Sequence, residues 1–165
     1  MKRRFNTKQL VQSALIGALY AVVTMICAPI SFSLVQVRIS EALTVLPYVT
    51  PVGVPGLFVG CLAANFICGA PLYDVIFGSL ATLIGALLTY LVRRQGLSKW
   101  LAPMPPVIVN ALIVGALMKY VYMPGEIGFL AAAAYVALGQ LIACYGLGMP
   151  LLALVEKYKD RLFKA

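Results

Sequence analysis

Long apolar runs without charged residues, separated by short polar segments, dominate the sequence. Residues 10–30 and 127–155 contain no charged side chain, and residues 72–92 contain only Asp74. An α-helix rises about 1.5 Å per residue, so about 20 residues cross a hydrocarbon layer of about 30 Å. Each of these runs therefore predicts a transmembrane helix.

Two further parts of the chain have the length and hydrophobicity of membrane helices. Residues 105–123 form another apolar run, which Lys119 interrupts near one end. Residues 40–69 are enough to cross the membrane and return, and Pro47, Pro51 and the glycines that follow divide this stretch into two short helices. The pattern predicts an all-α integral membrane protein with six transmembrane helices.

The composition agrees with a membrane protein. The chain of 165 residues is 62% hydrophobic and 11% charged, with a mean hydropathy of +0.97, which lies well outside the usage of soluble globular domains. No linker or change of composition divides the chain. We expect a single transmembrane domain over residues 1–165, with short basic cytoplasmic tails at about 1–9 and 156–165.

The basic residues predict the orientation. With six crossings and a cytoplasmic N-terminus, Arg38 and Lys119 fall outside, and the other eleven of the thirteen Lys and Arg fall inside. This bias follows the positive-inside rule and places both termini in the cytoplasm. Orientation and contact with anionic lipid then explain the net charge of +8, so we expect no nucleic-acid partner. The predicted inner cations are Lys2, Arg3, Arg4, Lys8, Arg93, Arg94, Lys99, Lys157, Lys159, Arg161 and Lys164.

The chain offers little chemistry for catalysis or metal binding. Its four cysteines lie within or beside apolar runs and it has no histidine, so we expect packing thiols and no metal site. It has no nucleophile–base constellation and no phosphate-binding loop, which argues against an enzyme and against ATP hydrolysis by this chain. We expect no catalytic residue and no cofactor, and concentrative uptake would need a partner.

Polar side chains inside the spans carry the functional signal, because lipid offers them no hydrogen-bond partner. Arg38 and Glu41 open the second predicted helix, and Asn65 lies near the outer end of the third. Asp74 starts the fourth helix at its outer end, and Gln140 lies about midway along the sixth. In the predicted topology these residues reach toward one outward-facing region, which predicts a binding site there.

Each of these polar residues also has an alternative structural role. Arg38 and Glu41 are three residues apart, the spacing at which two ions on one helix pair with each other. Asp74 has the position of a helix N-cap, where its charge suits the helix dipole. Asn65 and Gln140 have the chemistry of interhelical hydrogen bonds, which are worth about 1 kcal/mol each.

The first predicted helix carries a stripe of small residues. Ala14 and Ala18 are four residues apart, as are Gly17 and Ala21. This small-xxx-small spacing lets another helix approach closely along one face. The stripe predicts a docking face for a partner helix, although such patterns also arise by chance in apolar helices.

The chain resembles the QueT family of queuosine-precursor transporters. The resemblance lies in the string Gln36-Val37-Arg38-Ile39-Ser40-Glu41-Ala42-Leu43, followed by Leu46-Pro47, and in the size, the six predicted helices and the small-residue face. This family is one of the S components of energy-coupling factor (ECF) transporters. The resemblance implies an S-component-like bundle in the bacterial cell membrane, which binds ligand from outside. It also implies docking through the first helix onto an ECF transmembrane T component with two ATPase subunits, which hydrolyse the ATP.

The polar residues suit a 7-deazaguanine such as prequeuosine base or queuine. A guanine edge presents N1–H and N2–H2 as parallel donors, which the Glu41 carboxylate can accept. Arg38, Asn65 or Gln140 would then donate to O6, and Asp74 would attract a ligand's aminomethyl cation. A planar base also needs an aromatic face. Candidates for that face are Tyr73, Phe77 and Tyr48.

We therefore predict the substrate-binding subunit of an ATP-driven importer for a queuosine precursor. One alternative is an S component for another vitamin or nucleobase-like solute, because a polar cavity of this kind suits several heterocycles. Another is a self-contained homo-oligomeric carrier of small solutes driven by an ion gradient, in which Asp74 or Glu41 would titrate.

Overall fold

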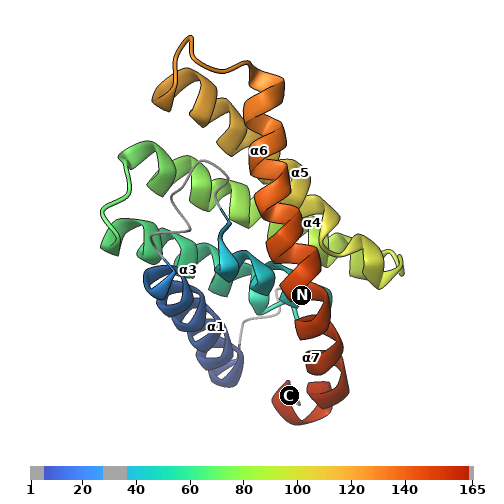
Figure 1. Ribbon diagram of the computed structural model, residues 1–165. Helices are drawn as coiled ribbons and strands as arrows, with labels where there is room; N and C mark the ends of the chain where they lie inside the picture. Colours follow the sequence, from blue (N-terminus) through green and yellow to red (C-terminus); the bar gives the residue numbers. More distant parts are fainter. Residues whose placement is uncertain (1–5, 28–36, 164–165) are drawn as a thin grey trace.

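The computed structural model describes residues 6–27 and 37–163, and every regular element in these ranges is helical (Figure 1). In chain order the elements are α1 (Thr7–Ile26), η1 (Ile39–Tyr48), α3 (Gly53–Ile67), η2 (Asp74–Gly78), α4 (Ser79–Arg94), η3 (Lys99–Leu101), α5 (Met104–Leu117), η4 (Met118–Tyr122), α6 (Phe129–Leu141), η5 (Ile142–Leu147) and α7 (Gly148–Leu162). η1 and η3 are 3₁₀-helices, whereas η2, η4 and η5 are π-helical segments of longer helices. The all-α prediction is confirmed.

Four helical stretches in the described residues are long and apolar enough to cross a membrane. They are Thr7–Ile26, Asp74–Arg94, Lys99–Tyr122 and Phe129–Lys159, and each overlaps one predicted run. The two short helices predicted within residues 40–69 correspond to η1 and α3, but η1 has only 10 residues and α3 only 15. Six crossings therefore remain a prediction.

Two of the helices, α3 and α4, end close to glycine residues with a positive φ angle. Gly69 and Gly96 follow the last residues of α3 and α4 with φ of 67° and 69°, a region that glycine enters without steric strain. Beyond α4, the Gly96 N–H donates to the Arg93 carbonyl (3.0 Å) and the Leu97 N–H donates to the Val92 carbonyl (3.1 Å). These bonds satisfy carbonyl groups that the end of a helix leaves without partners.

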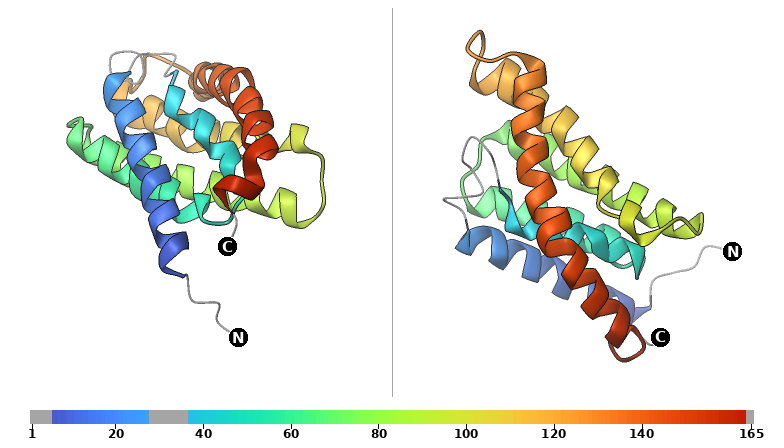
Figure 2. Two further views of the ribbon diagram at one scale, coloured as in Figure 1. Left: turned by 90° about the horizontal axis from the view of Figure 1, so that it is seen from below. Right: turned by 45° about the vertical axis from the view of Figure 1, so that its right-hand side comes forward.

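η1 lies at the centre of the bundle (Figure 1). It packs against α1, α3, α4, α7 and η5. Around it, α1 lies beside α3, α4 packs on α3 and α5, and α5 packs on α6. α6, η5 and α7 form one continuous helix that runs the length of the molecule (Figure 2). Because η1 has neighbours on all sides, every residue from Ser40 to Tyr48 is buried.

Glycines allow α1 and α3 to approach closely. A Cβ atom on Gly60 would lie 2.5 Å from the carbonyl oxygen of Gly17, and a Cβ atom on Gly17 would lie 2.8 Å from the carbonyl oxygen of Gly56. Any larger residue at these positions would force the two backbones apart. Helix packing in membranes commonly uses small residues in this way, because the surrounding lipid is as apolar as the helices themselves.

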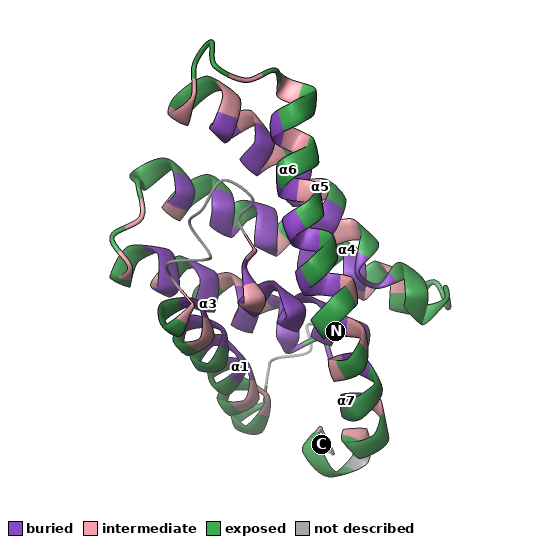
Figure 3. Cartoon of the chain, in the orientation of Figure 1, coloured by how far each residue is buried: buried purple, intermediate pink, exposed green. Residues whose placement is uncertain are grey.

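Many large apolar side chains are exposed, whereas several polar and charged side chains are buried among the apolar core residues. Figure 3 shows how the exposed and buried residues are distributed over the helices. Leu10 and Leu15 of α1 are each 64% exposed, and Leu130 of α6 is 83% exposed. By contrast, Ser40 and Glu41 are fully buried. Water-soluble proteins have the opposite distribution, so this one indicates a lipid environment.

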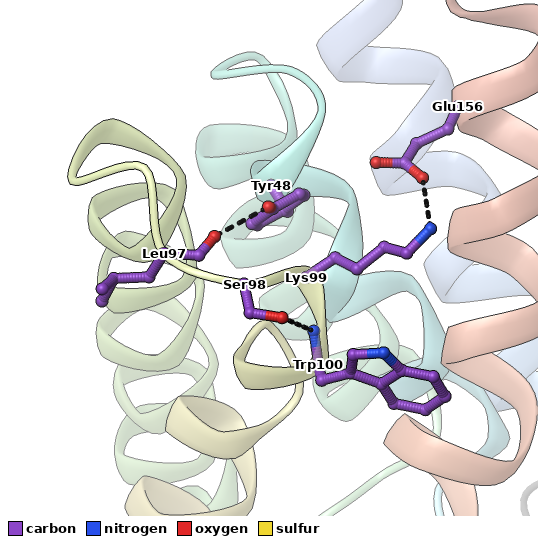
Figure 4. Close-up of polar contacts among 6 residues, drawn as sticks. All are labelled: Tyr48, Leu97, Ser98, Lys99, Trp100 and Glu156. Atoms are coloured by element: carbon purple, nitrogen blue, oxygen red, sulfur yellow. Dashed lines mark hydrogen bonds and ion pairs between the residues drawn. The ribbon is translucent and has the colours of Figure 1, made fainter.

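The start of α1, the end of α7 and the α4–α5 connection lie at one end of the bundle. The Gln12 side chain of α1 donates to the Leu162 carbonyl of α7 (2.8 Å). Lys99 Nζ, from the α4–α5 connection, lies 3.4 Å from Glu156 Oε2 of α7 (Figure 4). Cations predicted to face the cytoplasm therefore gather at this end, which we call the basic end. Of the predicted inner cations, those outside the described residues are Lys2, Arg3, Arg4 and Lys164.

The α4–α5 connection is tied to η1 and to the long helix. The Tyr48 hydroxyl of η1 donates to the Leu97 carbonyl (2.9 Å), and the Ser98 hydroxyl accepts the Trp100 N–H (3.4 Å) (Figure 4). The Tyr145 hydroxyl of η5 donates to the Trp100 carbonyl (3.0 Å). These bonds fix the connection against the bundle and place the end of η1 near the basic end.

Candidate functional site

The candidate site is built on η1. In a 3₁₀-helix the hydrogen bonds span three residues, so side chains three apart lie on one side. The Glu41 N–H donates to the Arg38 carbonyl (2.9 Å), and the Thr44 hydroxyl donates to the Glu41 carbonyl (2.5 Å). Arg38 is 5% exposed, whereas Glu41 and Thr44 are fully buried. The local geometry therefore directs polar groups into the interior of the bundle.

The Glu41 carboxylate has one oxygen engaged and the other open. Oε1 accepts hydrogen bonds from the Tyr20 hydroxyl of α1 (2.5 Å) and the Thr82 hydroxyl of α4 (3.3 Å). Oε2 is buried and has no hydrogen-bond partner within the described ranges. A buried carboxylate oxygen without a donor is unfavourable. Oε2 is thus suited to accept an N–H group from a ligand.

A second set of polar groups joins η1 to α3 and η2. The Arg38 guanidinium donates to the amide oxygen of Asn65, and the Asn65 amide donates to the Asp74 carbonyl (3.0 Å). The Asp74 carboxylate is close enough to Arg38 and to the Tyr122 hydroxyl for electrostatic interaction. A Cβ on Gly78 would lie 3.4 Å from Asn65 Nδ2 and 3.7 Å from Arg38 Nη1, so both side chains pass close to η2.

The structure thus brings Arg38, Glu41, Asn65 and Asp74 to one region of the interior. Arg38 donates to Asn65, whereas the Glu41 carboxylate accepts from Tyr20 and Thr82, so the two neighbouring charges use different hydrogen-bond partners. Charged and amide groups from η1, α3 and η2 line this region. It can present both a carboxylate acceptor and guanidinium or amide donors to one small polar molecule.

Gln140 joins this region through a cysteine. Gln140 is 2% exposed, and its side-chain oxygen accepts from the Cys144 thiol (3.4 Å). The same thiol lies 3.5 Å from the Glu41 carbonyl and 3.6 Å from the Thr44 hydroxyl. The helix formed by α6, η5 and α7 is therefore connected to η1 by weak hydrogen bonds. Cys144 bridges Gln140 and the Glu41 carbonyl.

The aromatic candidates are placed differently from the polar ones. Tyr73 and Phe77 are 53% and 42% exposed, although Asp74 between them is buried. Tyr48 is buried, but its hydroxyl bonds to the Leu97 carbonyl and its ring lies 5.4 Å from the Arg93 guanidinium carbon. Stacking of Tyr73 or Phe77 on a ligand remains a prediction, while Tyr48 has contacts toward the basic end.

The predicted docking residues divide between two environments. Gly17 and Ala21 are buried, and Gly17 packs against α3, whereas Ala14 and Ala18 are exposed. All four line a groove of about 350 Å³ between α1 and α3. The groove is apolar and shallow enough for an approaching helix. We call it the α1–α3 groove.

Sequence comparison then places this arrangement in a family. A model of the QueT transporter family matches residues 10–157, which is most of the chain and includes every element of the site. The chain belongs to the QueT transporter family. This is a family of transporters, which confirms the expectation that the chain is not an enzyme and the expectation of a membrane protein with several helices.

A curated relative shares part of this sequence. Over 84 residues the chain is 31% identical to a protein of Lactococcus lactis subsp. cremoris strain MG1363, named "Queuosine precursor transporter QueT". The aligned part covers 50% of this chain and 49% of that protein, so the match spans about half of the relative's length. No solved structure matches the chain.

Proposed function

We propose that this chain is the substrate-binding S component of an ATP-driven ECF-type importer. It would bind a queuosine precursor, a 7-deazaguanine such as prequeuosine base or queuine, from outside the cell. Partner subunits would then drive release into the cytoplasm. Membership of the QueT transporter family and the name of the Lactococcus relative support the substrate class.

The observation that carries the proposal is the open oxygen of Glu41. A 7-deazaguanine presents N–H donors on one edge, and a buried carboxylate oxygen without a partner can accept one of them. Oε2 of Glu41 is buried without a partner in the described residues, while two hydroxyls hold Oε1 in place. A ligand that donates to Oε2 would satisfy a group that the protein leaves unsatisfied.

The remaining polar groups would complete recognition. Arg38 and Asn65 supply donors for the O6 carbonyl of the base, and Asp74 supplies a negative charge for a cationic aminomethyl substituent. Gln140 would be a further donor to O6, and its contact with Cys144, which also contacts the Glu41 carbonyl, connects it to η1. In this arrangement the polar ligand contacts named above come from Arg38, which caps η1, and from η1, α3, η2 and α6.

Partner subunits would supply the energy. The chain has no phosphate-binding loop, so ATP hydrolysis would belong to two ATPase subunits bound to a transmembrane T component. The α1–α3 groove supports docking of that component, because its small residues leave room for a helix. The membrane would be the bacterial cytoplasmic membrane, with both termini on the cytoplasmic side.

The experiment that tests the ligand site is calorimetry with the variant Glu41→Gln. When Tyr20 and Thr82 hold the amide oxygen, the NH2 group takes the place of Oε2 and faces the N–H donors of the ligand, so affinity should fall by about 2–3 kcal/mol, or about 30- to 150-fold. The control is Glu126→Gln, which removes the same charge from an exposed connection. Unchanged affinity in Glu41→Gln would remove this carboxylate from the site.

A melting screen and copurification separate the proposal from its alternatives. A ligand at 100 times its dissociation constant should add about 2.7 kcal/mol of stability, so deazapurines, vitamins and nucleobases can be ranked directly. An S component should purify with a T component and two ATPases from its native membrane. A chain that purifies alone as a homo-oligomer and transports in liposomes would be a self-contained carrier instead.

A further inference from the structure

A second cavity lies on the surface between α4 and α5 at the basic end, and none of its lining residues belongs to the candidate ligand site. It has a volume of about 360 Å³ and is lined by apolar side chains that include Leu88 and Leu91 of α4 and Ile108 and Val109 of α5. Gln95 is the one polar side chain in its lining. We call this cavity the α4–α5 groove.

The groove is aliphatic over most of its lining and has its one polar residue at the end of α4. Gln95 is the C-cap of α4, and Leu88 lies seven residues before it on the same helix. At about 1.5 Å per residue these two lining residues are about 10 Å apart along the helix axis. We call the Gln95 end the mouth of the groove.

Arg94 and Trp100, two residues typical of the membrane–water interface, lie near the mouth of the groove in the sequence. Arg94 follows Leu91 by three residues on α4 and is exposed, so its side chain can reach the mouth. Trp100 is 63% exposed beside the groove residue Leu101, and tryptophan favours the interfacial layer of a membrane. The nearby cations Arg93 and Lys99 have other contacts, with the Tyr48 ring and Glu156.

This arrangement matches one kind of occupant. An apolar slot of limited depth suits the upper part of an acyl chain, and an arginine and a primary amide at its mouth suit a phosphate. We propose that the α4–α5 groove is a binding site for an anionic phospholipid, with the acyl chain between α4 and α5 and the headgroup phosphate on Arg94 and Gln95. The site is independent of the ligand site on η1.

The sole tryptophan of the chain, Trp100, precedes the groove residue Leu101 and provides an optical probe near this site. The protein is reconstituted in phosphatidylcholine with a small fraction of acyl-brominated phosphatidylglycerol or, separately, of acyl-brominated phosphatidylcholine. Bromine quenches tryptophan fluorescence at short range, so the ratio of the two quenching efficiencies reports lipid preference beside the groove. For the wild-type protein this ratio should be about five in favour of the anionic lipid, because one cation near the membrane surface, here Arg94, attracts an anionic lipid by about 1 kcal/mol.

Matched variants separate a defined site from general attraction to a basic surface. Arg94→Gln should bring the ratio close to one, whereas Lys157→Gln, which removes an exposed cation from α7, should leave it unchanged. Ile108→Phe should lower quenching by the anionic lipid because it fills the groove. Leu112→Phe, one turn further along α5 and outside the groove, should not.

Three results would overturn the proposal. A wild-type ratio of one would show that no anionic lipid is preferred. Equal losses in Arg94→Gln and Lys157→Gln would assign any preference to the overall charge of the basic end. Equal behaviour of Ile108→Phe and Leu112→Phe would show that the acyl chain does not occupy the groove.

Discussion

The carboxylate of Glu41 is held by hydroxyl groups that come from two other helices. Tyr20 of α1 donates to Oε1, and the hydroxyl of Thr82 of α4 lies within hydrogen-bond distance of both Oε1 (3.3 Å) and the Gly78 carbonyl of its own helix (3.1 Å), between which it shares its one proton. The bond from Tyr20 is the shorter contact of Oε1, and Oε2 stays without a partner in the described residues. Tyr20 therefore acts as a positioning residue for the proposed ligand contact.

Tyr20→Phe should weaken ligand binding without unfolding the protein. The ring still fills its buried position, but Oε1 loses its shorter hydrogen bond, and a hydrogen bond to a charged group is worth about 1.5–3 kcal/mol. Calorimetry should show about a ten- to 150-fold loss of affinity. The control is Tyr135→Phe on the exposed side of α6, which should bind normally. If Tyr20→Phe binds as tightly as the wild type, the orientation of Glu41 does not depend on this hydroxyl.

Asp74→Asn should discriminate between cationic and neutral ligands. The carboxylate is buried and close to Arg38, so it is placed to balance a cation brought by the ligand. We expect the aminomethyl compound to lose about 1–3 kcal/mol of binding energy and the neutral nitrile of the same shape to lose almost none. Competition binding with both compounds measures the difference. Equal losses would assign Asp74 to folding or helix capping.

Single-residue reasoning points to the charged members of this buried cluster but not to its hydroxyl members. Arg38, Glu41 and Asp74 stand out because charge inside apolar runs is rare. Tyr20 and Thr82 do not stand out, since hydroxyl side chains are common in membrane helices and can bond within their own helix. Only the packing of α1 and α4 around η1 shows that both reach the same carboxylate oxygen.

Among the elements, α1 has two faces with different tasks. One face carries Tyr20 and Thr24, which bond to the Glu41 carboxylate and the Ser40 hydroxyl of η1. The neighbouring face carries Ala14 and Ala18, which are exposed along the α1–α3 groove. Ligand binding and partner docking would therefore depend on different side chains of the same helix.

Replacing Ala14 and Ala18 together with tryptophan should separate these two tasks. The bulky rings would fill the α1–α3 groove and block a partner helix, while the contacts of η1 stay intact. Ligand affinity should stay within about twofold of the wild type, and uptake by cells that contain the partner subunits should stop. In the matched control, tryptophan replaces Leu15 and Leu19, which have the same spacing and lie outside the groove, and uptake should continue. Normal uptake by the Ala14/Ala18 variant would show that the groove is not the docking face.

The long helices and the two short helices within residues 40–69 were predictable from the sequence, whereas the 3₁₀ geometry of η1 and the end of α7 were not. A run of apolar residues identifies a helix that faces lipid, and four such runs match the structure. η1 is buried on every side, so its residues carry no periodic pattern that would distinguish a 3₁₀-helix. The last predicted apolar run stops at residue 155, but α7 continues to Leu162. The apolar pattern does not reveal these last turns, because they are amphipathic.

For the whole molecule, the gathering of cations at the basic end predicts the topology. The start of α1, the α4–α5 connection and the end of α7 share that end, so both termini should lie on the cytoplasmic side. An alkaline phosphatase fusion at the C-terminus should be inactive, whereas a fusion after Gly125, in the connection between η4 and α6, should be active. Activity of the C-terminal fusion would contradict the predicted orientation.

The exposed apolar surface has a thermodynamic consequence. Leu10, Leu15 and Leu130 face lipid in the folded protein, and they would still face lipid if the helices separated within the bilayer. Separation would thus transfer little apolar surface into water, the process that gives soluble domains a heat capacity of unfolding of about 12–15 cal/mol/K per residue. The heat capacity of helix separation should be far smaller here, so the free energy of separation should vary almost linearly with temperature, without the curvature that leads soluble domains to cold denaturation.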